Sequence, residues 1–176
     1  AGEKPNILMF YPGNHTLPDL DGATACRDQM IRTLAAIRRV APRARVLIKP
    51  HVICDLVDLN RELEAFRDID IRITFAHPLA LARHSVVCTV PNGTSVIDDM
   101  YVAGLPVIDS ALYLPEIREA EGSLFPNRGR ISATTDDELD RAFHTALSEP
   151  DRLAKPERGH LYWPKTPSLS QLLWRH

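Results

Sequence analysis

The chain is poor in cysteine and has no long apolar run. Its 176 residues include 3 cysteines, Cys26, Cys54 and Cys88, which lie far apart in unlike contexts. This spacing excludes a disulfide framework and a CxxC pair. No apolar run approaches the roughly 18–20 residues that a membrane span requires. We therefore expect a cytoplasmic protein without membrane spans, and association with the inner face of a membrane stays open.

The chain also lacks a dense run of Lys and Arg. It has 21 Lys and Arg against 23 Asp and Glu, so its formal net charge is -2. Nucleic-acid binding needs a clustered basic surface, so we expect no such partner. No GxSxG turn, Walker loop or GxGxxG turn is present, which disfavours hydrolase, P-loop and dinucleotide-binding functions. His51, Cys54, His77 and His84 fit no metal-ligand spacing, so we expect neither a metal nor a cofactor.

What is present suits one domain, because 44% of the residues are hydrophobic and 25% are charged. A chain of this length can bury one good core but is short for two ordinary domains. We expect an α/β domain over residues 1–149. Residues 150–176 form a tail rich in proline and aromatic residues, with a terminal helix near 168–174.

Apolar runs and helical stripes alternate along residues 1–149. Nearly unbroken apolar runs predict buried strands at 6–11, 45–49, 86–90 and 107–108. Ile69 to Phe75 alternates apolar and polar residues, which predicts an edge strand, and a last short strand is expected at 130–133. Helices are predicted at 24–41, 56–67 and 79–83. Two further helices are predicted, one that begins at Thr94 or Ser95 and one that begins with a capping box at Thr135 to Glu138.

This alternation predicts a doubly wound parallel sheet of about six strands, with helices on both faces. Right-handed crossovers give the strand order 3-2-1-4-5-6. In such sheets a ligand lies beyond the carboxyl ends of the strands, at the switch point between strands one and four. The sequence therefore predicts the site at that edge.

The turn Asn92, Gly93, Thr94 and Ser95 is the first candidate at this edge, because it precedes a helix. Free backbone N–H groups and the helix dipole favour an anion there. Lys49 could add a positive charge from the end of a neighbouring strand. The alternative is that Thr94 or Ser95 only caps its helix.

Other polar side chains are expected at the same edge. Two histidines follow strands, and each could equally be an ordinary loop residue. Asp99 lies about one turn into the helix that follows the turn 92–95. Its carboxylate could accept a hydrogen bond from a ribose hydroxyl, or it could only complement the helix dipole. The set of further candidates is Asn14, His15, His51, His77, Asp99 and Tyr113.

Three segments in order resemble a known family: IKPH at 48–51, AHP at 76–78 and PNGTSVIDDMYVAGLPVI at 91–108. They are similar to the C-terminal half of GT-B glycosyltransferases of bacterial surface polysaccharide synthesis. That group includes capsule β-Kdo transferases, sialyltransferases and CDP-glycerol glycerophosphotransferases. Two departures are Val52, where the capsule enzymes usually have a second proline, and Asp99, where many relatives carry glutamate.

The resemblance implies a Rossmann-like domain that binds a nucleotide sugar, such as a CMP- or CDP-linked one, without a metal. Lys49 and His51 would approach the phosphates or the sugar, Thr94 and Ser95 a phosphate, and Asp99 the ribose. The catalytic base usually comes from an N-terminal domain, so we expect that domain or a partner chain to be needed, together with a glycan acceptor. In a self-contained enzyme, His15 or Asp19 could act as the base.

Two other functions stay open. One is a nucleotide-sugar 2-epimerase, which shares the architecture. The other is a non-catalytic interaction module, with a patch around Tyr162, Trp163 and Trp174 engaging protein.

Overall fold

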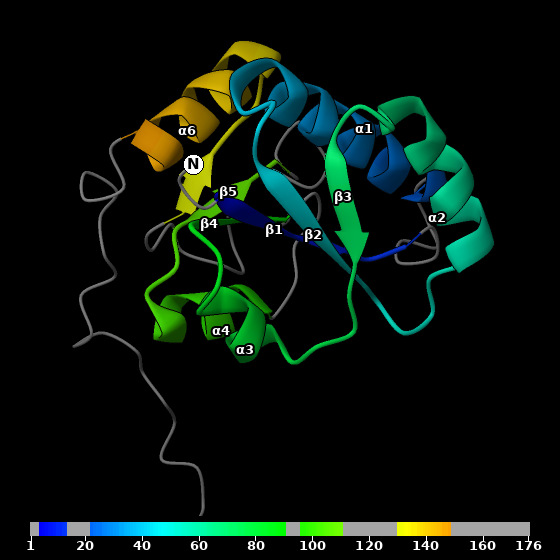
Figure 1. Ribbon diagram of the computed structural model, residues 1–176, viewed down its shortest axis with the longest axis horizontal. Helices are drawn as coiled ribbons and strands as arrows, with labels where there is room; N and C mark the ends of the chain where they lie inside the picture. Colours follow the sequence, from blue (N-terminus) through cyan, green and yellow to red (C-terminus); the bar gives the residue numbers. More distant parts are fainter. Residues whose placement is uncertain (1–3, 14–21, 91–95, 111–129, 149–176) are drawn as a thin grey trace, which may run out of the picture.

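The computed structural model describes residues 4–13, 22–90, 96–110 and 130–148. Within these ranges the strands are β1 (Asn6–Tyr11), β2 (Arg45–Pro50), β3 (Asp70–Ile73), β4 (Val87–Val90), β5 (Val107–Asp109) and β6 (Arg130–Ser132) (Figure 1). The helices are α1 (Gly22–Val40), α2 (Leu56–Leu63), α3 (Pro78–Ala82), α4 (Val96–Ala103) and α6 (Asp136–Ser148). A 3-10 turn, η1 (Glu64–Phe66), directly follows α2. The expected tail at 150–176 lies outside the described residues.

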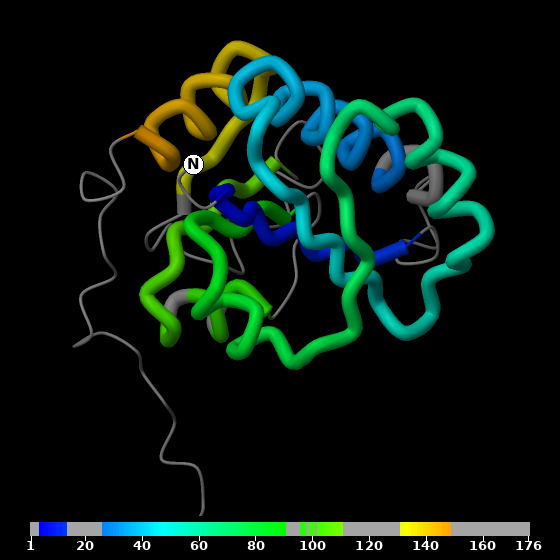
Figure 2. Tube along the Cα trace, in the orientation of Figure 1, coloured from blue at the N-terminus to red at the C-terminus, as the bar shows by residue number. Residues whose placement is uncertain are grey.

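The strands form one sheet in the order β3-β2-β1-β4-β5-β6, and every neighbouring pair is parallel. The chain starts at the centre, moves outward to β3, and then crosses back to β4, as Figure 2 shows. This Rossmann-like arrangement confirms the predicted strand order, with β3 at one edge. The switch point lies between β1 and β4.

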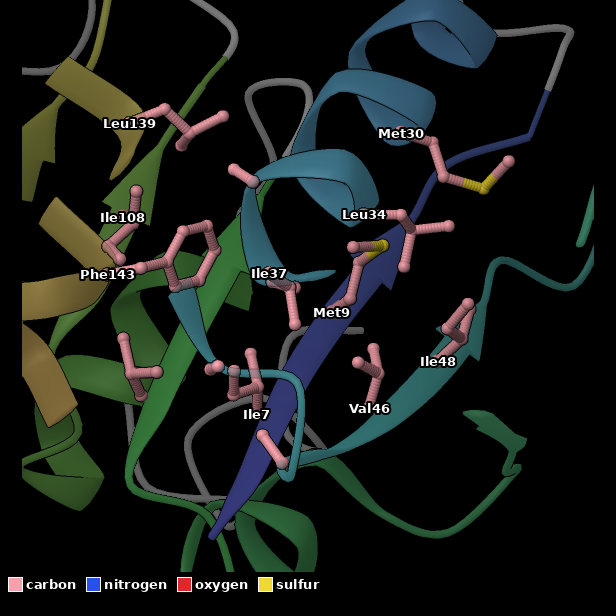
Figure 3. Packing of buried hydrophobic residues seen from close by; sticks show 14 of the residues in the cluster. Ile7, Met9, Met30, Leu34, Ile37, Val46, Ile48, Ile108, Leu139 and Phe143 are labelled. Atoms are coloured by element: carbon pink, nitrogen blue, oxygen red, sulfur yellow. The ribbon is translucent and has the colours of Figure 1, made fainter. Parts of the chain in front are cut away.

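Helices cover both faces of the sheet, as predicted, and β1 shows why its apolar run is unbroken. Ile7 and Met9 pack among side chains of α1, α2 and α6, whereas Leu8 and Phe10 pack among side chains of α3 and α4. Figure 3 shows the first cluster, with residues of α1 and α6 packed over the sheet. Because alternate residues of a strand point to opposite faces, a strand covered twice needs apolar residues throughout.

The strand β3 is shorter than predicted. It ends at Ile73, and Phe75, expected on its apolar face, is 66% exposed. The N–H of Thr74 still donates to the carbonyl of Ile48 at 2.9 Å. The next bond of a parallel ladder would need an N–H from Pro50, which has none. The proline in β2 therefore ends the pairing of β3.

The helix α2 buries less of its predicted stripe than expected. Leu59 and Phe66 are 1% and 4% exposed, as the stripe requires, but Leu56 is 38% exposed. Leu56 is the first residue of α2, directly after the N-cap Asp55. The core contacts of α2 therefore begin at Leu59, about one turn after its first residue, Leu56.

The capping box at the start of α6 is present, with one change. The hydroxyl of Thr135 accepts a hydrogen bond from the N–H of Glu138 at 3.3 Å, as predicted. The carboxylate of Glu138 instead reaches one residue further back, to the N–H and hydroxyl of Thr134, both at 2.7 Å. These bonds satisfy backbone and side-chain donors near the first turn of the helix.

Candidate functional site

Lys49 and His51 flank the last residue of β2, beside the central strand β1. Lys49 lies opposite Phe10 in the register of β1 and β2 and is half-buried. Its neighbour Ile48 packs in the α1 layer, so Lys49 lies on the opposite face, the face of α3 and α4. His51 is exposed in the loop that follows. Both predicted residues therefore lie at the carboxyl end of β2, next to the central strand β1.

Two hydrogen bonds hold His51 in place. Its N–H donates to the carbonyl of Tyr11 at 2.8 Å, which ties the loop after β2 to the end of β1. Its ring Nδ1 accepts from the N–H of Ile53 at 3.4 Å. A neutral ring that accepts at Nδ1 carries its proton on Nε2. In that form the Nε2–H of His51 is a hydrogen-bond donor.

His77 and Asp99 belong to elements on the α3 and α4 face. His77 is exposed and caps α3, because its Nδ1 accepts from the N–H of Leu79 at 3.3 Å. It follows the edge strand β3, two strands away from β1. Asp99 is half-buried and lies in the first turns of α4, as predicted. Their contacts with a substrate stay predictions.

The other predicted residues lie outside the described ranges. They are Asn14, His15, Asn92, Gly93, Thr94, Ser95 and Tyr113, together with Asp19. Of the predicted set, the structure therefore places Lys49 and His51 at the end of β2, His77 at the start of α3, and Asp99 in α4, which follows β4.

A buried polar group on the other face of the sheet was not predicted. The Thr33 hydroxyl donates to the carbonyl of Gln29 at 2.7 Å and lies 3.2 Å from the Ser110 hydroxyl. Thr33 and Ser110 are both 0% exposed. This group joins α1 to the carboxyl end of β5. Its only sequence signal is a polar residue, Thr33, on the apolar side of a helix.

On the same face of the sheet, two buried oxygens have no hydrogen-bond partner in the part of the chain that the structure describes: Oε1 of Gln29 and Oγ1 of Thr89. Gln29 is 3% exposed and Thr89 is 0% exposed. Thr89 lies on the same face of β4 as Val87, which packs in the α1 layer. A buried polar atom without a partner costs about 1–3 kcal/mol. Thr89 is the one polar residue in the apolar run of β4, and this was the signal that could have found it.

A second cluster that the sequence did not predict surrounds the end of β1. Tyr11 is 2% exposed, and burial together with the nearby Glu62 carboxylate raises the pKa of Tyr11 far above its ordinary value. Glu62 pairs with Arg27 at 3.0 Å, yet burial raises the pKa of Glu62. Burial, followed by the Asp55 carboxylate, raises the pKa of Cys54. Because its pKa is raised, the Cys54 thiol is a poor nucleophile.

Among the described residues, no group of three or more His, Cys, Asp or Glu side chains could hold a metal ion. Over the same residues, no helix has the length and apolar character needed to cross a membrane.

No protein-family model matches this chain, and no curated protein matches its sequence. Among solved structures, the chain is similar to spinosyn forosaminyltransferase SpnP, with 18% identity and a TM-score of 0.48. The similarity covers 84% of this chain and 37% of that protein, so the chain spans well under half of its length. A likeness this distant carries no function over to the present chain.

Proposed function

We propose that the chain is a nucleotide-sugar-binding domain of a glycosyltransferase that builds bacterial surface polysaccharide in the cytoplasm. The observation that carries the proposal is that Lys49 and His51 flank Pro50, the last residue of β2, beside the switch point of a 3-2-1-4-5-6 sheet. Ligands of doubly wound sheets bind at this point. The resemblance of IKPH, AHP and the 91–108 segment to the glycosyltransferase motifs names the ligand class.

Each residue has a role in this proposal. The Lys49 ammonium pairs with a phosphate, and the Nε2–H of His51 donates to the phosphate or the sugar. The segment 92–95 precedes α4 in sequence and supplies hydroxyl and backbone donors to the phosphate. Asp99, in the first turns of α4, accepts from the ribose.

The reaction needs more than these groups. The glycan acceptor and the catalytic base would come with an N-terminal domain or a partner chain. His15 and His51 are the catalytic candidates within this chain, and binding of the donor needs no metal. Association with the inner face of the membrane would bring the domain to its acceptor.

Calorimetric titration with CMP, CDP, UDP and GDP tests the proposal. We expect a cytidine nucleotide to bind, and Lys49→Ala to weaken binding about tenfold or more, because a hydrogen bond to a charged group contributes about 1.5–3 kcal/mol. Thr94→Ala should also weaken binding. Arg43→Ala removes an exposed positive charge from the turn between α1 and β2 and should leave binding unchanged.

Absence of binding by all four nucleotides, or equal loss in Lys49→Ala and Arg43→Ala, would overturn the proposal. Turnover of UDP-N-acetylglucosamine would instead identify an epimerase, because the substrate of that enzyme differs from the expected donor.

One observation favours a second candidate, the non-catalytic interaction module. Val52 and Phe75 are 92% and 66% exposed and lie two residues beyond the ends of β2 and β3, and Val57, in the first turn of α2, is 69% exposed. Exposed apolar side chains gathered at one edge are typical of protein contacts. This function requires that no nucleotide binds, and that Val52→Asp or Phe75→Asp abolishes association with a protein partner.

A further inference from the structure

We propose that the free edge of β3, with the groove beside it, binds an extended peptide of alternating apolar and acidic residues as an added strand. This inference does not depend on the proposed nucleotide site, which lies at a different edge of the sheet.

The backbone of β3 can accept another strand. β3 is the end strand of the sheet, and no described segment pairs with its outer side. The bond from the N–H of Thr74 to the carbonyl of Ile48 shows that every second residue of β3 bonds to β2. Ile71 and Ile73, the residues between, therefore turn their backbone groups outward. The N–H of Ile71 bonds to the Ile69 carbonyl at 3.0 Å, so the Ile71 carbonyl and both groups of Ile73 are left for an incoming strand.

A groove of about 510 Å³ runs beside this edge, between β3 and the α2–η1 segment. Its apolar lining consists of Leu63, Phe66, Ile69, Ile71 and Ile73, and its polar and charged lining consists of Asn60, Glu64, Arg67 and Arg72. Successive side chains of an added strand would point to opposite faces, so every second one would lie over this lining. The groove thus selects apolar side chains at alternate positions of the peptide.

The β3 edge also carries an excess of positive charge around Asp70. Asp70 pairs with Lys4 at 3.3 Å, with Arg45 at 3.2 Å and with Arg72 at 3.1 Å. One carboxylate thus faces three cations, whose side chains are 55%, 41% and 69% exposed. Desolvation opposes ionisation of Asp70, but hydrogen bonds from Lys4 and Arg45 outweigh it and lower its pKa. Acidic side chains at the remaining positions of the peptide would complement this surplus.

The same charges disfavour a second copy of this chain as the occupant. Antiparallel pairing of β3 with β3 would bring two such groups together, each with more cations than carboxylates. Like charges placed opposite each other destabilise a strand pair, and charged edges are a common device against self-association. An acidic partner strand removes this repulsion, whereas a second copy doubles it.

The test measures binding of a short fluorescent peptide of alternating glutamate and valine to the full chain, by anisotropy at low salt. A matched peptide of alternating lysine and valine is the control ligand. We expect the glutamate peptide to bind and the lysine peptide to bind at least about tenfold more weakly, since charge complementarity selects between them. Binding should weaken as salt is added.

Three variants locate the site. Arg72→Glu should weaken the glutamate peptide about tenfold or more and improve the lysine peptide. Ile73→Pro removes an outward N–H at an edge position that tolerates proline, and should weaken both peptides. Arg141→Glu, a matched charge reversal on exposed α6, should change neither. Circular dichroism of each variant confirms that it is folded.

Three outcomes overturn the proposal: no binding of the glutamate peptide to the unmodified chain, equal affinity in Arg72→Glu, or dimerisation of the chain that Ile73→Pro abolishes while no peptide binds. None of these outcomes bears on nucleotide binding, so the two proposals fail separately.

Discussion

The two halves of the carboxyl edge of the sheet carry their polar groups in different ways. At the ends of β4 and β5, Thr89, Asp109 and Ser110 are each 0% exposed. After β2 and β3, His51 and His77 are exposed. We call the first the buried half and the second the exposed half. The sheet order brings both to the same edge, on either side of the switch point beside β1.

The difference in exposure between the two halves predicts that one half contributes to stability and the other to ligand binding. A polar group in the buried half must find its partners inside the protein, because leaving water without one costs free energy. A polar group in the exposed half stays hydrated until a ligand arrives. Substitutions in the exposed half should therefore alter ligand affinity with little change in stability, whereas those in the buried half should alter the free energy of unfolding.

The largest expected contrast comes from one isoleucine in each half. Ile108→Ala in β5 should lower the free energy of unfolding by about 2–5 kcal/mol, because Ile108 is 0% exposed and its removal leaves a cavity. Ile73→Ala in β3 should cost about half as much or less, because Ile73 is only half-buried. Urea unfolding of both variants measures the difference. Equal losses would show that the edge strand is packed as tightly as the centre.

The same contrast explains which parts of the fold could be predicted from the sequence. The bounds of β1 came out as predicted, because a strand buried on both faces leaves an unbroken apolar run. The end of β3 did not, because it depends on Pro50 in the neighbouring strand rather than on its own residues. Local patterns thus predict elements, and pairing between elements sets their ends.

The candidate site divides in the same manner. The positions of Lys49 and His51 at the end of β2 could be predicted, because polar residues at the end of a buried strand stand out in sequence. Their part in binding stays a prediction. The contact between Thr33 and Ser110 could not, because it joins residues 77 apart in the chain. Nothing local marks two hydroxyls as partners when one lies on a helix and the other beyond a strand.

Two threonines of the buried half should respond in opposite directions to the same change. Thr89→Val removes a buried hydroxyl that has no partner, and should raise the free energy of unfolding by about 1 kcal/mol. Thr33→Val removes a hydroxyl that bonds to Gln29 and contacts Ser110, and should lower it by about 1 kcal/mol. Thermal and urea unfolding measure both. A loss in Thr89→Val would mean that this oxygen has a partner in solution.

Within the exposed half, two helix caps should differ. Asp55→Ala removes a carboxylate that accepts from two N–H groups of α2, at 2.8 Å and 3.3 Å, and should cost about 1 kcal/mol. His77→Ala removes a single bond at 3.3 Å from the short helix α3, and should cost only a few tenths of a kcal/mol. Urea unfolding compares them. A loss in His77→Ala as large as in Asp55→Ala would make His77 chiefly a structural residue.

The smallest expected effects on stability come from two half-buried carboxylates, Glu62 in α2 and Glu138 in α6. Burial raises the pKa of Glu62, whereas hydrogen bonds from the Thr134 side chain and backbone lower the pKa of Glu138. The stability that Glu62 contributes is therefore complete below its ordinary value of 4.5 and is lost as pH rises through the raised pKa. The contribution of Glu138 is present above 4.5 and is lost as pH falls through the lowered pKa.

Unfolding of the unmodified chain, Glu62→Gln and Glu138→Gln between about pH 3 and pH 7 separates the two. As pH rises, the unmodified chain should lose stability relative to Glu62→Gln and gain stability relative to Glu138→Gln, because glutamine mimics the protonated carboxyl in both. Hydrogen bonding to one half-buried carboxylate and desolvation of another thus act with opposite sign on one fold. Shifts in the same direction for both variants would show either that burial does not raise the pKa of Glu62 or that hydrogen bonding does not lower the pKa of Glu138.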